Sequence, residues 1–393
     1  MIAIFRNPRN PLLRVGALLS ALWLAACQPT GGFGPNSGQT IDAGAPVPVA
    51  LLVPAGSGKP GDDTLAQALQ NAANLAMSDL QGVKIDLRVY HTAGNANVAA
   101  QVAARAVDEG AKIILGPVYA ENANAAGLAV ASRNVNVLAF SNNTAIAGGN
   151  VFVLGPTFGN TAERLASYAV KHGKRRVLVV ADDNPAGAIG AQAIGQAVAR
   201  SGGTVSARIS YPFSQAGVAT AAPQIAARVK AGDVDAAFFT ADTAGALPLL
   251  AQMLPEQGLT PDMAQFIGLT RWDIPPATLS MQGLQGGWFA LPDPNLNAQF
   301  QSRYQAAYGD APHPIAGLAY DGIAAIGALA RSGDPNALTR SGLTQPQGFA
   351  GVNGIFRLRG DGTNDRGLAV AQVRNGQAVV IEAAPRSFAG AGL

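Results

Sequence analysis

The sequence has few of the residues that build disulfide frameworks or metal sites. Among its 393 residues there is one cysteine, Cys27, and there are three histidines. A single cysteine cannot form an intrachain disulfide, so no disulfide scaffold holds this fold. The histidines, His91, His172 and His313, lie far apart and have no cysteine or carboxylate neighbours at metal-ligand spacing. We therefore expect neither a metal site nor a cofactor.

The short motifs of common catalytic and nucleotide-binding sites are also missing. No Gly-x-Ser-x-Gly nucleophile elbow occurs, and no Gly-x-Gly-x-x-Gly follows the first predicted strand. The stretch Gly56-Ser57-Gly58-Lys59 lacks the first glycine of a phosphate loop and is followed by proline. These absences predict a protein that is not an enzyme and holds no dinucleotide.

Net positive charge is missing as well, once the N-terminus is set aside. The chain has 27 Lys and Arg against 24 Asp and Glu, and three of the arginines fall in the first 26 residues. The remainder therefore has 24 charges of each sign. No cluster of basic residues is interleaved with aromatics, so we expect no nucleic-acid partner.

The N-terminal apolar run, Val15 to Leu24, is shorter than a membrane span. Three arginines precede it and Leu24-Ala25-Ala26-Cys27 closes it, which is typical of a secretory signal. The closing tetrapeptide resembles the bacterial lipobox, and this resemblance implies removal of residues 1–26 and lipidation of Cys27. An ordinary secretory signal with an incidental cysteine is the alternative.

Residues 27–46 are rich in Gly, Pro and polar side chains, so we expect them to form a flexible tether. About 345 residues then remain, more than one hydrophobic core usually holds. The sequence therefore predicts two lobes behind a tether, held at the membrane by a lipid anchor.

The stretch from Ala111 to Thr157 predicts a strand, a helix and a second strand. Lys112 to Leu115 and Val135 to Phe140 are short apolar runs, and Ala120 to Ser132 between them has helical spacing. A helix that connects two parallel strands brings the loops after both strands to one edge of the sheet. Ligands bind at that edge in open parallel sheets. The loops 116–119 and 141–144 are therefore our candidate ligand mouth.

Strands and helices alternate through most of the chain, and the pattern starts again near residue 176. This alternation predicts an α/β fold with two doubly wound Rossmann-like lobes. An antiparallel appendage at the C-terminus is expected, with an Asn-Gly turn at 375–376. The predicted strands are 47–53, 84–90, 112–115, 135–140, 176–181, 204–211, 236–240, 265–269, 288–291, 354–359, 367–373 and 378–382.

Polar residues also follow the strands of the second lobe. Asp182-Asp183-Asn184 either contacts a ligand or caps the helix that begins after it, and capping is the favoured interpretation. Thr240 and the loop Thr270 to Asp273 follow two further strands. Tyr119 and Trp272 either stack on a ligand or seal the cleft.

Three motifs in order carry a family resemblance: Leu115-Gly116-Pro117, Phe140 to Thr144, and Ala319-Tyr320-Asp321-Gly322. The chain from residue 47 onward resembles the type I periplasmic binding proteins, in particular the leucine/isoleucine/valine-binding branch. The resemblance implies two lobes joined by a three-crossover hinge, near Pro156, near Pro292 and between about 334 and 351. Lobe one would comprise 47–156 plus 292–334, and lobe two 157–291 plus 335–393.

Two loops depart from the amino-acid binders of that family. Those proteins hold the ligand carboxylate with a serine after the Gly-Pro turn, where this chain has Val118 to Glu121. They hold the ammonium with an acid in lobe two, where this chain has Thr270-Arg271-Trp272-Asp273. That loop and the lipobox are similar to the lipoprotein activators of penicillin-binding proteins, the branch we take as closest.

The resemblance gives two alternative functions. The preferred one is a regulator that binds a peptidoglycan synthase (penicillin-binding protein); the alternative is the substrate-binding component of an ABC importer for amino acids or another small polar solute, with its permease as partner. Both imply a periplasm-facing lipoprotein, and Gln28 after the cysteine favours the outer membrane by analogy. The expected cleft residues are Tyr119, Ser141, Asn142, Thr144, Asp182, Thr240, Arg271, Trp272 and Asp273.

Overall fold

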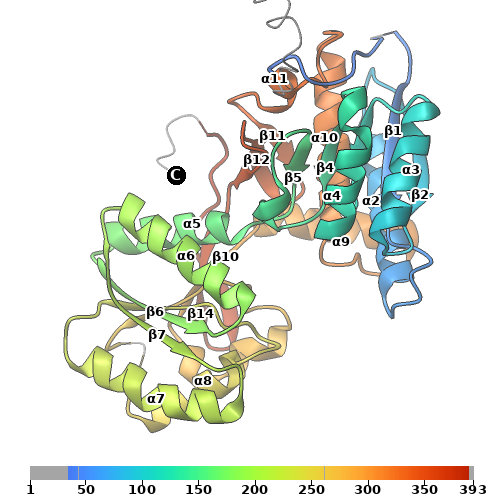
Figure 1. The fold of residues 1–393 in the computed structure, drawn as a ribbon. Coiled ribbons are helices and arrows are strands. Elements are labelled where there is room, and N and C mark those ends of the chain that lie inside the picture. Colours follow the sequence, from blue (N-terminus) through green and yellow to red (C-terminus); the bar gives the residue numbers. More distant parts are fainter. Residues whose placement is uncertain (1–33, 43, 261, 389–393) are drawn as a thin grey trace, which may run out of the picture. The chain divides into compact units, whose positions relative to one another are not determined.

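The computed structural model describes residues 34–42, 44–260 and 262–388. The predicted signal peptide and Cys27 lie outside these residues. None of the helices in the described ranges is long and apolar enough to cross a membrane. Two parallel sheets with helices on both faces make up most of the fold, as the sequence predicts (Figure 1).

The first sheet has five parallel strands in the order β2-β1-β3-β4-β5. Its central strands are short, apolar and buried on both faces, which is typical of a parallel sheet covered by helices. The register places Leu51 beside Leu115, and Leu115 beside Leu138. The strands are β1 (Val47–Val53), β2 (Ile85–His91), β3 (Ile113–Leu115), β4 (Asn136–Ala139) and β5 (Val151–Val153).

Helices cover both faces of this first sheet. On one face α2 (Asp62–Asp79), α9 (Pro294–Tyr308) and α10 (Gly317–Arg331) bury an apolar core. On the other face lie α3 (Ala96–Asp108) and α4 (Ala120–Val130), both rich in alanine. The packing is close, because a Cβ added at Gly322 of α10 would lie 2.3 Å from a methyl carbon of Leu115.

The second sheet repeats the strand order of the first, as β7-β6-β8-β9-β10, and adds β14 and β15 antiparallel beyond β10. Figure 1 shows α5 and α6 on one face of its parallel part and α7 and α8 on the other. The parallel strands are β6 (Arg176–Asp182), β7 (Thr204–Tyr211), β8 (Ala236–Phe239), β9 (Gln265–Gly268) and β10 (Trp288–Leu291). The other elements are α5 (Phe158–Lys171), α6 (Pro185–Arg200), α7 (Gln215–Lys230), α8 (Leu247–Glu256), β14 (Ala369–Arg374) and β15 (Gln377–Glu382).

The C-terminal region differs from the sequence prediction. We expected the predicted strand 354–359 to belong to one antiparallel appendage with 367–373 and 378–382. Instead β12 (Gly354–Leu358) pairs with β11 (Phe349–Gly351) and β13 (Asn364–Arg366) in a separate three-stranded sheet. The strand β13 is short and polar, so it has no apolar alternation to predict it. Asn364 fixes it instead, because its amide donates to the carbonyls of Val153 (2.7 Å) and Gly155 (2.9 Å).

The core contacts also divide the chain differently from our lobe boundaries. Residues 335–393 were assigned to lobe two, yet Phe349, Phe356 and Leu358 pack in the core of the first sheet. Together with α11 (Arg340–Leu343), the strands β11 and β12 extend lobe one beyond residue 334, whereas β14 and β15 belong to the second sheet. The reason is that the aromatic side chains of β11 and β12 pack against the apolar face of α10. This long-range contact cannot be predicted from the linear sequence.

A buried ion pair connects α10 to β13. The Arg366 Nη1 lies 3.2 Å from the Asp321 Oδ2, and their side chains are 3% and 0% exposed. The Asp321 carboxylate also accepts from the Val352 backbone (2.8 Å) and from the Asn353 amide (3.3 Å). The guanidinium of Arg366 donates to the Leu154 carbonyl, with Nε at 3.0 Å. This network joins α10, β13 and the chain just after β5.

A second carboxylate, Asp235, connects the N-terminal ends of β6 and β8. It accepts from the Arg176 side chain (Nη2, 2.7 Å) and from the backbone amides of Arg175 and Arg176. The ion pair with Arg176 and these amides lower the pKa of Asp235, although burial opposes them.

Because the pKa of Asp235 is lower in the folded state, its contribution to stability is present above the unfolded pKa of about 3.9 and is lost as pH falls through the folded value. We expect Asp235→Asn to destabilise the protein at pH 7 and to matter less at pH 3. Urea unfolding at both pH values measures this. If the substitution lowered the free energy of unfolding equally at both pH values, the lowered pKa of Asp235 would be contradicted.

Candidate functional site

In the first sheet the strand order reverses between β1 and β3, and the loops after these two strands meet there. Such a reversal opens a crevice at the carboxyl ends of the strands. The loop after β1 leads into α2, whose first residue is Asp62, and the loop after β3 ends at Tyr119. The Tyr119 hydroxyl donates to the Asp62 Oδ1 at 2.5 Å.

Tyr119 is therefore held in place by its own lobe. The hydrogen bond to Asp62, with burial adding to it, raises the pKa of Tyr119 to about 12, so the phenol stays protonated and remains a donor. The Lys59 ammonium lies 5.0 Å from the centre of its ring. The N-cap position of α2 is Gly61, and the Asp62 carboxylate accepts from Tyr119 rather than capping the helix.

The loop after β4 places Ser141 differently from Asn142 and Thr144. Ser141 is buried, and its Oγ accepts from the Asn143 amide at 3.1 Å. Asn142 and Thr144 are exposed. After the other predicted loop, 116–119, α4 begins at Ala120 with no side chain capping it among the described residues. Its first backbone N–H groups are therefore open to an anion, although Glu121 in the first turn disfavours one.

The reversal of strand order in the second sheet brings Asp182 and Thr240 together. The Thr240 Oγ1 accepts from the Asp182 backbone amide (3.1 Å) and lies 3.4 Å from its Oδ2. The carboxylate also raises the pKa of the neighbouring Tyr211, an effect that burial of the phenol dominates. The helix cap is Asn184, whose side chain accepts from the Gly187 amide at 2.8 Å. The capping interpretation is thus confirmed for Asn184, whereas Asp182 is buried beneath the strand ends.

The loop after β9 corrects one of the sequence interpretations. Trp272 is 0% exposed and packs in the core of the second sheet, with its ring centre 6.1 Å from that of Phe289. It therefore cannot stack on a ligand in this arrangement. Arg271 and Asp273 remain near the surface and pair with each other, with Nη2 to Oδ2 at 2.5 Å. Side chains alternate in direction along residues 271–273, so the Trp272 indole points into the core and the charged groups of Arg271 and Asp273 point outward.

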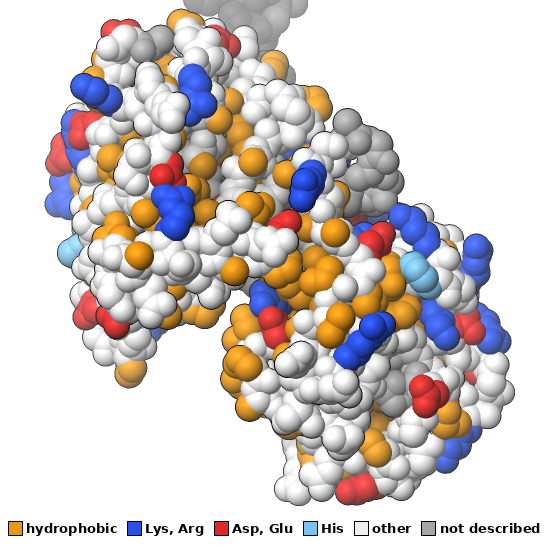
Figure 2. All heavy atoms as spheres, turned by 180° about the vertical axis from the view of Figure 1, so that it is seen from behind, with side chains coloured by type: hydrophobic (Ala, Val, Ile, Leu, Met, Phe, Trp, Pro, Cys, Tyr) orange, Lys and Arg blue, Asp and Glu red, His pale blue; other side chains and the backbone are white. Residues whose placement is uncertain are grey.

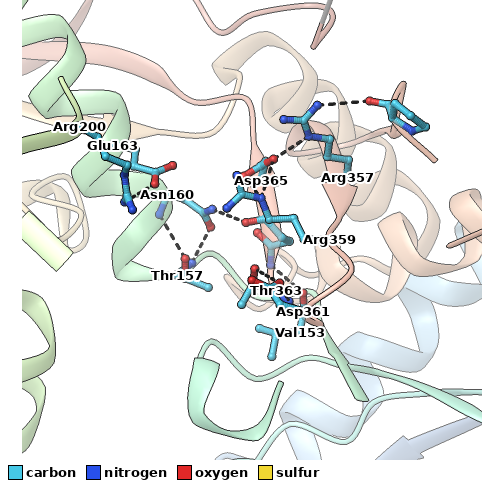
Figure 3. Close-up of polar contacts among 12 residues, drawn as sticks. Val153, Thr157, Asn160, Glu163, Arg200, Arg357, Arg359, Asp361, Thr363 and Asp365 are labelled. Carbon is cyan, nitrogen blue, oxygen red and sulfur yellow. Dashed lines mark hydrogen bonds and ion pairs between the residues drawn. The ribbon is translucent and has the colours of Figure 1, made fainter. Parts of the chain in front are cut away.

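A cavity of about 570 Å³ adjoins the loop after β4. Its walls are residues 142–144, the start of α5, one face of α6 and the turn 359–365 between β12 and β13. Figure 3 shows polar side chains of α5, α6 and this turn facing one another. We call it the linker cavity. Its size suits a small organic ligand.

The linker cavity includes Asn142 and Thr144 of the predicted residues. It does not include Tyr119, Asp182, Thr240 or the loop 271–273. The sequence analysis missed Gln192 and Gln196, which line this cavity from α6. The sequence pattern that could have indicated them is a pair of glutamines four residues apart in an otherwise alanine- and glycine-rich helix.

Charges of both signs are distributed over the surface. On the face drawn in Figure 2, Lys and Arg side chains are interspersed with Asp and Glu. The described residues contain no group of three or more His, Cys, Asp or Glu placed to hold a metal ion.

Two α/β sheets whose five parallel strands share one order, each with polar loops at its carboxyl edge, define a ligand-binding protein of the two-lobed α/β class. The periplasmic binding protein family model matches residues 46–378. The chain belongs to this family of ligand binders, and its type I fold, predicted from the sequence, is confirmed. Membership implies a location in the cell envelope. No curated protein matches the chain.

Solved structures with the same fold include three ABC transporter proteins. A putative branched-chain amino acid transporter protein from Rhodospirillum rubrum is 19% identical, with a TM-score of 0.72 over 86% of this chain and 100% of that one. A substrate-binding protein from Desulfitobacterium hafniense, in complex with leucine, is 18% identical, with a TM-score of 0.63 over 86% and 100%. A solute-binding protein from Rhodopseudomonas palustris BisB5, in complex with 3,4-dihydroxybenzoic acid, is 20% identical, with a TM-score of 0.57 over 86% and 96%.

Proposed function

We propose that this protein is the substrate-binding component of an ABC importer for a small polar solute. The observation that carries the proposal is the family match over residues 46–378, combined with polar loops at the carboxyl edges of both sheets. The structural neighbours from D. hafniense and R. palustris bind carboxylate-bearing solutes, leucine and 3,4-dihydroxybenzoic acid. These neighbours favour the importer over the regulator as the first candidate.

The uncapped start of α4 supports a carboxylate-bearing solute for this chain as well. Free backbone N–H groups at a helix N-terminus bind anions, and the hydroxyl of a neighbouring loop adds a further polar group. In the proposed complex the solute carboxylate lies at Ala120 and Glu121, beside the loop that begins at Ser141. Glu121 is the one feature that opposes it, by charge repulsion.

The test is a screen of amino acids and aromatic acids by thermal shift and calorimetry. We expect one solute to raise the melting temperature, since a ligand at 100 times its dissociation constant adds roughly 2.7 kcal/mol. Glu121→Gln should strengthen its binding about two- to fivefold, because an acid in the first helical turn is worth about 0.3–1 kcal/mol against an anion. The matched control is Glu256→Gln at the end of α8. No shift with any solute would overturn the importer proposal.

A regulator that binds a penicillin-binding protein is the second candidate. One observation favours it: the charged and aromatic groups of the strand-end loops are engaged with one another. Arg271 pairs with Asp273, Tyr119 donates to Asp62, and Trp272 is buried. The charges that clamp a zwitterion are therefore not free. Capture of a peptidoglycan synthase from detergent-solubilised envelopes, with no solute response, would favour this candidate.

Lipidation of Cys27 forms part of both proposals. A lipid anchor at Cys27 would keep the binding domain close to a membrane-embedded permease or synthase. The expected tether 27–46 is shorter than predicted, because Ile41 is buried in the core of the first sheet and the Arg340 and Ser341 amides donate to the Ser37 and Pro35 carbonyls. Mass spectrometry of the mature N-terminus tests this, and an unmodified cysteine would contradict it. The outer membrane, favoured by Gln28, is part of the same proposal, and membrane fractionation tests it.

A further inference from the structure

The charged groups that line the linker cavity already have partners. Arg200 pairs with Glu163, and the Arg359 Nε lies 3.1 Å from the Asp365 Oδ1. Asp361 accepts from the backbone amide (2.9 Å) and hydroxyl (2.5 Å) of Thr363. Burial alone would raise the pKa of Asp361, but these hydrogen bonds outweigh it and lower the pKa. A charged ligand would have to compete with these pairs.

Four neutral polar side chains of the same cavity are free. Within the described part of the chain, no side chain or backbone group hydrogen-bonds to the side chains of Asn142, Thr144, Gln192 or Gln196. Gln192 and Gln196 are four residues apart and therefore on one face of α6. Each carboxamide offers two donors and an acceptor, and the threonine offers both in one hydroxyl. This set matches a ligand with several hydroxyl groups.

The same wall also presents apolar surface. Ile189 of α6 is 51% exposed and lines the cavity three residues before Gln192, and Phe158 lines it from the start of α5. An exposed aliphatic side chain beside free carboxamides favours a ligand that is apolar on one face and hydroxylated at its rim. Sugar rings have this character.

We propose that the linker cavity is a binding site for a neutral saccharide, separate from the start of α4. The free carboxamides bind the sugar hydroxyls, and Ile189 and Phe158 pack against the C–H face of a ring. The volume of about 570 Å³ lies within the ordinary range of small-molecule sites. This inference goes beyond the proposed solute importer, because it rests on side chains of α5 and α6 and concerns a different chemical class of ligand.

Maltose, cellobiose and sucrose are the probes, measured by calorimetry on the full chain, with glucose 6-phosphate and leucine as comparison ligands. We expect at least one disaccharide to bind. The combined Gln192→Ala and Gln196→Ala variant should bind it at least tenfold more weakly, because two hydrogen bonds are lost. Gln101→Ala, an exposed glutamine on α3, is the matched control and should leave binding unchanged. Hydrogen exchange should show protection at 186–200 and 359–365.

No binding of any disaccharide at 10 mM would overturn the proposal, and so would binding that the double variant leaves intact. Tighter binding of glucose 6-phosphate than of every disaccharide would overturn the assignment of a neutral ligand. Leucine binding without saccharide binding would leave the importer proposal standing and remove this one. Saccharide binding with no response to any amino acid or aromatic acid would do the reverse.

Discussion

Replacing Asp321 by alanine is expected to lower the free energy of unfolding by about 3–5 kcal/mol, because it leaves the Arg366 guanidinium buried without its partner. The two side chains are 0% and 3% exposed, so water cannot replace the lost carboxylate. The Val352 amide also loses its acceptor. Urea unfolding measures the loss, and we expect the slope of the unfolding free energy against urea concentration to stay unchanged.

The matched control is Asp273→Ala, which removes the partner of Arg271 near the surface. There the loss should stay below about 1 kcal/mol, because solvent reaches and screens this partly buried pair. Replacing both buried partners, by Asp321→Leu with Arg366→Met, should recover much of the stability. If Asp321→Ala costs no more than Asp273→Ala, the buried pair does not hold α10 to β13.

Replacing Trp272 by alanine is expected to cost about 3–5 kcal/mol, the usual loss for a large aromatic side chain in a core. The ring fills space that Gly268 and Gly287 leave, since a Cβ at either glycine would lie within 2.5 Å of it. Solute affinity in the folded fraction should be unchanged, because the side chain is not exposed.

Phe213→Ala is the control for Trp272, because Phe213 is exposed and its loss should change stability by less than about 0.5 kcal/mol. Trp272→Phe should fall between the two. If Trp272→Ala had normal stability but did not bind solute, the ring would lie in the ligand cleft and not in the core.

Burial of Trp272 and of Asp182 shows where the sequence stops being informative. The sequence predicts that both residues follow strands; Trp272 does follow β9, whereas Asp182 is the last residue of β6. The sequence does not indicate which way a loop side chain turns, because loops have no fixed periodicity. Trp272 turns toward the two glycines, whereas Arg271 and Asp273 turn outward and pair. The contact between Asp182 and Thr240, 58 residues apart, depends on β6 and β8 being neighbours.

The sequence by itself determined the two doubly wound α/β lobes, because short apolar runs and helical spacing are local patterns that record burial directly. It also determined the loops that lie at the carboxyl edge of each sheet. Only the tertiary structure decided the pairing of β13, the burial of Asp321 with Arg366, and the linker cavity between α5, α6 and the turn 359–365. These features join residues that are far apart in the chain, and their polar side chains acquire a role only from the partners that folding brings to them.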